Sequence, residues 1–251
     1  MFVQVAFCMF AAGLLLGFTG AGGSGFIIAI LTVGFGYPIH TALGTALSAM
    51  FFSSLSGTLS HYREGNARLR AGLVVGICGA AGAWGCSQLS GLIPADQLKW
   101  MTSSILFISG LMLWLRIALA ARLQHESDPM KTQGPKYWAS ASCVGLGTGA
   151  LSGLFGIGAT PFIQIGLMTV LKMSARYAAG TTMLVIVPIA LGGGVGYYRL
   201  GYLDIHLLLA VTVGIMMGSY LGAKLTRRVP LLYLQAAMAL VPMIGATILL
   251  L

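Results

Sequence analysis

Residues 13–27 of the chain read GLLLGFTGAGGSGFI, and this stretch decides the fold. It lies in an apolar region, yet it holds six glycines, each of which weakens a helix interior by about 1 kcal/mol relative to alanine. We therefore expect one helix to end near Thr19 and a second to begin near Ser24. In a membrane, such a break persists only where it is buried in protein or faces a polar cavity. The second helix would present free N–H groups, with a partial positive charge, to that cavity.

A second copy of the stretch follows at residues 149–163, which read GALSGLFGIGATPFI. At this offset of 136 residues, from 13 to 149, four glycines, a phenylalanine and an isoleucine are identical. Ser24 becomes Thr160, which is also a good helix N-cap, and Gly25 becomes Pro161, which suits the first turn of a helix. Two broken membrane segments at corresponding places in two halves are the best sequence-level pointer to a transporter's binding site.

The composition is that of a membrane protein, because 57% of the residues are hydrophobic and only 8% are charged. Most apolar segments are long enough for the roughly 20 residues of a spanning helix. We expect an all-α, polytopic membrane protein with five apolar segments in each half, at 2–19, 26–36, 39–61, 69–91, 96–119, 138–155, 161–172, 175–198, 205–225 and 230–251. The second segment of each half is about half a bilayer long. The first two segments therefore predict a glycine-broken re-entrant or half-helix hairpin, beside three spanning helices.

The repeat extends beyond the glycine stretch at the same offset. The sequence Ala-x-Gly-Thr occurs at 42–45 and at 178–181, and Tyr-Arg-x-Gly occurs at 62–65 and at 198–201. A register kept without gaps over this length indicates a duplication. We divide the chain into a first transmembrane repeat at 1–119, a cytoplasmic linker at 120–137 and a second transmembrane repeat at 138–251.

The basic residues predict that the second repeat is inverted relative to the first. If each hairpin returns to its own side and the other three segments cross, the loops at 62–70, 116–136, 172–176 and 224–229 share one side. These loops carry twelve of the fourteen Lys and Arg residues: Arg63, Arg68, Arg70, Arg116, Arg122, Lys131, Lys136, Lys172, Arg176, Lys224, Arg227 and Arg228. This asymmetry places the four loops in the cytoplasm and both termini outside it. The basic residues are spread over loops, so the net charge of +9 does not indicate a nucleic-acid partner.

The candidate site lies at the membrane midplane between the repeats, where both breaks would aim N–H groups at a small anion. Hydroxyls early in the third segment of each half would either donate to an oxyanion or bond to carbonyls of their own helix. The candidate substrate-binding residues are Gly22, Gly23, Ser24, Gly25, Phe26, Thr45, Ser48, Gly158, Thr160, Pro161, Phe162, Gln164, Thr181 and Thr182. We interpret Gly13, Gly17, Gly149 and Gly153 as packing positions in the manner of GxxxG contacts.

Several function classes lack the residues they need. All five acidic residues fall in loops or at segment ends, so the usual carboxylate for proton or sodium coupling is missing from the membrane interior. No Walker motif, HExxH, GxSxG or Cys/His cluster occurs, so we expect no enzymatic activity, no cofactor and no metal site. His40 and His61 lie near segment ends, where we favour a structural role over proton transfer.

Over essentially its whole length the chain resembles the sulfite exporter TauE/SafE family. The residues that carry the resemblance are the glycine-rich stretch ending in Phe26-Ile27, its copy at 155–162, the two Ala-x-Gly-Thr sequences, and GSYLGAKL at 218–225 before RRVP at 227–230. The second copy departs from the first in having Gly158-Ala159-Thr160 in place of a glycine-rich run. The resemblance implies a multi-pass transporter in the bacterial inner (plasma) membrane that moves sulfur-containing anions such as sulfite or organosulfonates.

We therefore expect a secondary transporter of a small anion, a sulfur oxyanion or organosulfonate, that works by alternating access. Its partners would be the anionic substrate and the lipid bilayer, with no nucleic acid and with a homo-oligomer left open. The alternatives are a passive channel for a small solute and a non-transporting membrane scaffold. A channel would show flux that neither saturates nor accumulates the solute, whereas in a scaffold the glycines would only pack helices.

Overall fold

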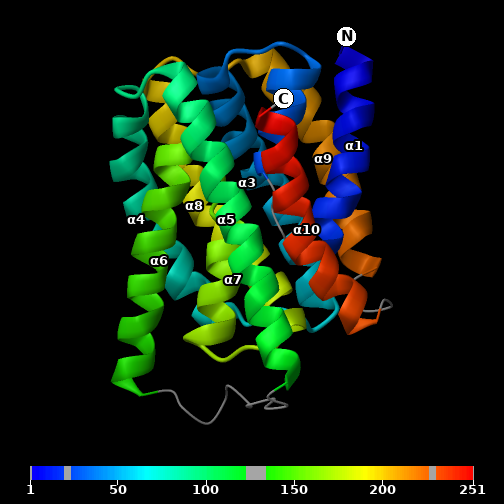
Figure 1. The fold of residues 1–251 in the computed structure, drawn as a ribbon, viewed down its shortest axis with the longest axis vertical. Helices are drawn as coiled ribbons and strands as arrows, with labels where there is room; N and C mark the ends of the chain where they lie inside the picture. Colours follow the sequence, from blue (N-terminus) through cyan, green and yellow to red (C-terminus); the bar gives the residue numbers. More distant parts are fainter. Residues whose placement is uncertain (1, 20–23, 123–133, 226–229, 251) are drawn as a thin grey trace.

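The computed structural model describes residues 2–19, 24–122, 134–225 and 230–250, and in these ranges the chain is helical, with short connections and no β-strand (Figure 1). The first half contributes α1 (Phe2–Thr19), α2 (Ser24–Ala29) with a π-helical extension η1 (Ile30–Gly34), α3 (Ile39–Arg63), α4 (Leu69–Ser90) and α5 (Ala95–Arg122). The second half contributes α6 (Pro135–Phe155), α7 (Thr160–Thr169), α8 (Ala175–Arg199), α9 (Ile205–Leu225) and α10 (Leu231–Leu250). The predicted all-α fold is confirmed.

The ten predicted apolar segments correspond in order to these helices, with α2 and η1 together forming the second. The main difference concerns the predicted linker at 120–137. The helix α5 runs to Arg122, and α6 already begins at Pro135, so both helices extend into that range. Proline suits a first helical turn, because its missing N–H would have no intrahelical partner there. Residues 123–133 lie outside the described part of the chain.

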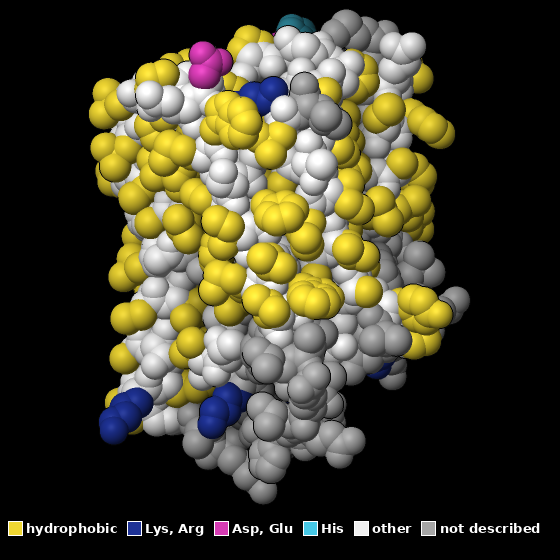
Figure 2. Space-filling model, in the orientation of Figure 1, with side chains coloured by type: hydrophobic (Ala, Val, Ile, Leu, Met, Phe, Trp, Pro, Cys, Tyr) yellow, Lys and Arg dark blue, Asp and Glu magenta, His cyan; other side chains and the backbone are white. Residues whose placement is uncertain are grey.

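Within the described residues, six helices are long and apolar enough to cross a membrane: α3, α4, α5, α8, α9 and α10. Three belong to each half, as the segment pattern predicts. Their outer faces carry exposed large hydrophobic side chains, such as Ile77, Trp114 and Met217. Figure 2 shows such side chains spread over the middle of one face, with Lys or Arg side chains near its upper and lower ends. An apolar surface of this extent suits contact with lipid.

The helix pairing is unchanged when the two halves are exchanged. The helix α1 packs along α9, and its counterpart α6 packs along α4, the counterpart of α9. In the same way α4 packs on α8 while α9 packs on α3, and α5 packs on its own counterpart α10. Each half therefore packs its first helix against the other half.

Glycines allow these close approaches at counterpart positions. A Cβ at Gly13 would meet the carbonyl oxygen of Ile215, and one at Gly149 would meet that of Gly79, which is the counterpart of Ile215. A Cβ at Gly17 would collide with the backbone of Ser219, as one at Gly153 would with that of its counterpart Ala83. The packing role predicted for these glycines is confirmed, and the close contact between backbones is typical of small-xxx-small helix pairs.

The two halves begin at opposite ends of the molecule. Figure 1 shows the N-terminus, and hence the start of α1, at the upper end, whereas α6 begins at the lower end. The helices α1 and α6 therefore run in opposite directions. This arrangement supports the predicted inverted repeat, whose orientation in a membrane stays a prediction.

Candidate functional site

Both predicted helix breaks lie where the glycines are. The helix α1 ends at Thr19 and α2 begins at Ser24. In the second half, α6 ends at Phe155 and α7 begins at Thr160. Between them Gly156, Gly158 and Ala159 all have positive φ, of 61°, 62° and 44°. Glycine enters this left-handed region freely, but alanine does so at a cost of roughly 1–2 kcal/mol, so the turn at 156–159 is held by its surroundings.

The two breaks meet inside the protein. A Cβ at Gly158 would lie 3.6 Å from the hydroxyl oxygen of Ser24, the first residue of α2. Ser24 and its counterpart Thr160 are buried, and within the described chain neither hydroxyl has a hydrogen-bond partner. A buried hydroxyl without a partner is unfavourable, so two of them at one junction mark a place suited to a polar ligand.

A small cavity opens at this junction. Its lining comes from the first residues of α2 and α7, the turn before α7, and the middles of α5 and α10: Gly25, Phe26, Leu106, Ile157, Thr160, Pro161, Val241 and Pro242. Two pairs of these are counterparts in the repeats, Gly25 with Pro161 and Leu106 with Pro242. The cavity is therefore lined in part by equivalent positions of both halves.

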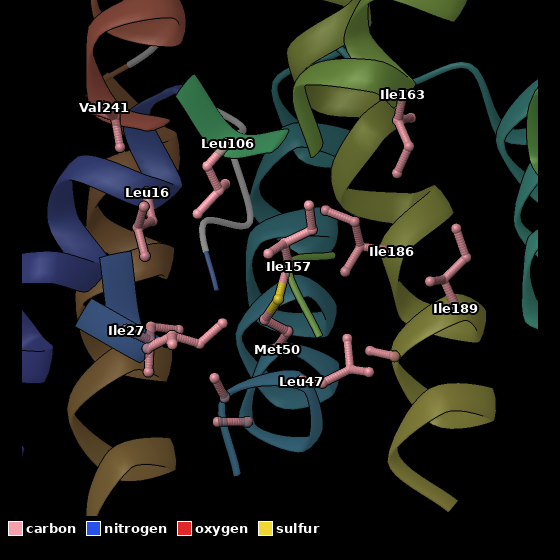
Figure 3. Packing of buried hydrophobic residues seen from close by; sticks show 14 of the residues in the cluster. Leu16, Ile27, Leu47, Met50, Leu106, Ile157, Ile163, Ile186, Ile189 and Val241 are labelled. Carbon is pink, nitrogen blue, oxygen red and sulfur yellow. The ribbon is translucent and has the colours of Figure 1, made fainter. Parts of the chain in front are cut away.

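Apolar side chains nearly fill this cavity. The space open to the centre of a water molecule is about 10 Å³, which is room for roughly one water. Figure 3 shows Met50 reaching from α3 toward Ile157, and both side chains are buried. The methyl carbon of Met50 also occupies the place that a Cβ of Gly158 would take. In this conformation the junction is closed to any ligand larger than a water molecule.

The structure brings only part of the predicted residue set to the cavity. Gly25, Phe26, Thr160 and Pro161 line it, and Ser24 and Gly158 adjoin it. The predicted residues Phe162 and Gln164 belong to α7 but are absent from the lining. Gly22 and Gly23 lie outside the described residues.

The hydroxyl-bearing residues predicted on α3 are not among those that line the cavity. Thr45 is completely buried and has no hydrogen-bond partner within the described chain. The Ser48 oxygen lies against α8, where a Cβ added to Gly194 would approach it to 2.9 Å. Neither residue is in the cavity lining, so a role of Thr45 and Ser48 in substrate binding stays a prediction.

The hydroxyls predicted on α8 already have partners. Thr182 Oγ1 donates to the carbonyl of Ala178 at 2.7 Å, which is the own-helix bond given above as the alternative reading. Thr181 Oγ1 accepts a hydrogen bond from the backbone N–H of Arg68 at 3.1 Å. Thr181 therefore holds the residue that precedes α4, and both threonines lie away from the cavity lining.

Sequence reasoning missed the apolar half of the site. Leu106, Val241, Pro242 and Ile157 line the cavity, yet none of these residue types signals binding. One signal was available: the repeat offset pairs Leu106 with Pro242, a proline inside the helix α10. Within the described residues no three of His, Cys, Asp and Glu come together, so no metal-binding group is present in that part of the chain.

Comparison with known proteins points to membrane transporters. A family model described as "Sulfite exporter TauE/SafE" matches residues 5–249. The "Probable membrane transporter protein YdhB" of Bacillus subtilis is 48% identical over 243 residues, covering 96% of this chain and 97% of that protein. A "Probable membrane transporter protein" of Xylella fastidiosa is 27% identical over 218 residues, covering 86% and 81%. The "Probable membrane transporter protein MJ0441" of Methanocaldococcus jannaschii is 27% identical over 234 residues, covering 88% and 84%.

Proposed function

Because the chain belongs to the sulfite exporter TauE/SafE family and is a multi-pass membrane transporter, we propose that it moves a small anion, a sulfur oxyanion or organosulfonate, as a secondary transporter. The anion would bind where the two broken hairpins meet, and the protein would alternate between openings to the two sides of the membrane. The transmembrane repeats at 1–119 and 138–251 would be inverted, joined by a cytoplasmic linker. Both termini would lie outside the cytoplasm of a bacterial cell.

One observation carries this proposal: two buried hydroxyls without partners, from opposite halves, adjoin a cavity made of counterpart residues. Ser24 and Thr160 are donors suited to the oxygens of an oxyanion. Thr160 also begins α7, a helix of ten residues in whose first turn the N–H groups of Thr160 and Phe162 lack intrahelical acceptors, since Pro161 has no N–H and Ile163 donates to Ala159. Free N–H groups and the helix dipole both favour a negative charge at this end.

Selectivity for a small anion follows from the rest of the lining. Leu106, Ile157 and Val241 are apolar and offer a cation no oxygen ligands. The neighbouring Gly158 has no side chain that would keep a ligand away from the backbone. The flexible end of Met50 now fills the space beside Gly158, and a ligand would take this space when Met50 moves. An anion with three oxygens and a compact centre would use the hydroxyls and N–H groups at once.

Transport requires the closed junction to open. The cavity is smaller than any sulfur oxyanion, so we take this conformation as an occluded one. Met50 and Ile157 would move aside when the anion binds, and one repeat would then rock against the other. At the close glycine contacts between α1 and α9, and between α4 and α6, the backbones meet without a glycine side chain between them, which suits such a motion.

The proposal is tested with purified protein in lipid vesicles, using uptake of radiolabelled sulfite, sulfate and a small sulfonate. We expect saturable flux of at least one of these anions, and Ser24→Trp should abolish it because the indole would fill the junction. Gly85→Trp is the matched control, since Gly85 on α4 is exposed with open space around it. Equal flux in the two variants would contradict the site, and flux that never saturates would indicate a channel instead.

A further inference from the structure

His61 in α3 and Tyr197 in α8 occupy counterpart positions of the two repeats, at the same offset as the glycine stretches. Both side chains are completely buried, close to the ends of their helices. Among the described residues, His61 is the only buried side chain of the His, Lys, Arg, Asp and Glu types. An imidazole and a phenol differ in shape and basicity, but both can donate a hydrogen bond. We therefore ask which acceptor each of the two side chains meets.

Each of the two side chains contacts a carbonyl oxygen of the broken helix in its own repeat. Nε2 of His61 lies 3.3 Å from the carbonyl oxygen of Gly17, near the end of α1. The hydroxyl of Tyr197 lies 3.4 Å from the carbonyl oxygen of Leu154, near the end of α6. A carbonyl only accepts hydrogen bonds, so His61 carries a hydrogen on Nε2 and Tyr197 donates its phenolic hydrogen.

These carbonyls are among the groups that a helix end leaves without partners. The last four carbonyls of an α-helix have no intrahelical donor, and α1 ends at Thr19 while α6 ends at Phe155. Gly17 and Leu154 belong to those last four residues. In a membrane interior no water supplies the missing donors, so an unpartnered carbonyl there is strongly unfavourable.

We infer that His61 and Tyr197 are positioning residues that cap the C-terminal ends of the two broken helices and so hold these helix ends in place beside the anion site. The inference rests on the proposed function for its effect on transport. The capping itself stands on the two hydrogen bonds alone. The requirement at this position is then a side-chain donor, which the two repeats satisfy with different residues.

Packing alone does not account for the pair. A phenylalanine would fill either place without a polar atom in the buried interior. The second nitrogen of His61, Nδ1, is buried and has no hydrogen-bond partner within the described chain, so this site keeps histidine despite an unfavourable polar atom. The Tyr197 hydroxyl also donates to Oγ of Ser90 on α4, at 2.9 Å, which is the shorter of its two contacts. Its one hydrogen is therefore shared between Ser90 and the carbonyl of Leu154.

The test removes the donor and then restores it in the form that the other repeat uses. The variants are His61→Phe and His61→Tyr in α3, and Tyr197→Phe and Tyr197→His in α8. Two quantities are measured in vesicles: hydrogen–deuterium exchange at the last turns of α1 and α6, and the KM and maximal rate of anion uptake. Ser90→Ala is the control for Tyr197→Phe, because it removes the other hydrogen bond of the phenol.

His61→Phe should speed amide exchange at the end of α1 about tenfold, as expected for one lost buried hydrogen bond, without changing the end of α6. Tyr197→Phe should do the reverse, and both should raise KM more than they change the maximal rate. His61→Tyr should restore slow exchange and a low KM. Tyr197→Phe changes one atom in place, so it remains informative if a histidine variant does not fold.

The outcomes separate the two levels of the argument. Unchanged exchange at the end of α6 in Tyr197→Phe, or equal effects of Tyr197→Phe and Ser90→Ala, would overturn the capping role. Faster exchange at the expected helix end, in a protein that transports none of the tested anions, would keep the capping role and count against the proposed function. Faster exchange with unchanged KM would show that the caps do not set the site.

Discussion

Gly158, in the turn before α7, faces Ser24, the first residue of α2, with 3.6 Å between the place of its missing Cβ and the serine hydroxyl oxygen. The two residues are 134 positions apart in the chain and belong to different repeats. Their contact means that neither broken hairpin forms a site alone. Any substitution that pushes them apart acts on both repeats at once.

Gly158→Ala should reduce anion flux strongly and lower stability. The new methyl group would enter space held by Met50, and the alanine would have to keep the positive φ of the glycine. The strain from φ alone is roughly 1–2 kcal/mol for a non-glycine residue. Gly65 has a similar φ of 72° but open space around it, so Gly65→Ala carries the strain without the collision. Thermal unfolding and vesicle flux of the two variants separate strain from steric effect. A flux loss of equal size in both would leave the site without support.

Gly25→Ala should be partly compensated by Leu106→Ala. A Cβ at Gly25 would meet the end of the Leu106 side chain, so the single variant overpacks the cavity wall by about 1–3 kcal/mol. Shortening Leu106 alone is expected to lower the free energy of unfolding by about 2–5 kcal/mol. The double variant should lose about 1 kcal/mol less free energy of unfolding than the sum of the losses in the two single variants, because the shortened side chain removes the clash.

The control for that pair is Leu98→Ala, a fully buried leucine on the same helix, about 12 Å away along the axis. Gly25→Ala and Leu98→Ala should add without coupling, since they share no contact surface. Denaturant unfolding in detergent measures the unsubstituted protein, the three single variants and the two double variants. Coupling of similar size in both pairs would mean that Gly25 does not contact Leu106 in the membrane.

The sequence predicted the helices well because a membrane allows few alternatives. In an all-α membrane protein, an apolar segment that spans lipid is helical. Successive glycines, as before Ser24 and at Gly156 and Gly158, favour the end of a helix. The second-half break was predictable even though Ala159 replaces a glycine, because the offset aligned it with the first. The closest packing partners across repeats, such as Gly17 with Ser219, were not predictable from type alone.

The apolar wall of the cavity shows why the site was only half predicted. Ser24 and Thr160 stand out as polar residues in apolar sequence, whereas Leu106 and Val241 resemble dozens of lipid-facing residues. Only their place in three dimensions distinguishes them. Thr182 is a polar residue in apolar sequence that does not line the cavity. Its hydroxyl donates to the carbonyl of Ala178, and the sequence does not reveal this local bond.

Thr181→Val and Thr182→Val should differ in their effect on the free energy of unfolding, although the two residues are neighbours in the chain. Thr181→Val removes the acceptor for the Arg68 N–H and should lower the free energy of unfolding by about 1 kcal/mol. Thr182→Val removes a bond to a carbonyl that keeps its own helical donor, so its effect should stay within about 0.5 kcal/mol. Thermal unfolding in detergent checks the difference. A flux defect in Thr182→Val at unchanged stability would return that residue to the substrate path.

Met50→Ala should widen the range of anions that the protein accepts. Met50 is fully buried and fills the space beside Gly158, so truncation enlarges the closed junction. The loss of a buried methionine is expected to lower the free energy of unfolding by about 2–5 kcal/mol. A bulkier sulfonate should gain relative to sulfite, because the added room benefits only the larger ligand. The measurement is the ratio of the two uptake efficiencies in vesicles.

The ratio is informative because both anions are carried by the same protein, so a general loss of folded protein cancels. Leu47→Ala is the matched control: Leu47 is equally buried on α3 but packs against Gly193 of α8, away from the cavity lining. It should lower stability by a similar amount and leave the ratio unchanged. A ratio that shifts equally in both variants would attribute the change to loosened packing and not to the junction at Ser24. A shift confined to Met50→Ala would place the moving anion beside Gly158, because only that substitution makes room there.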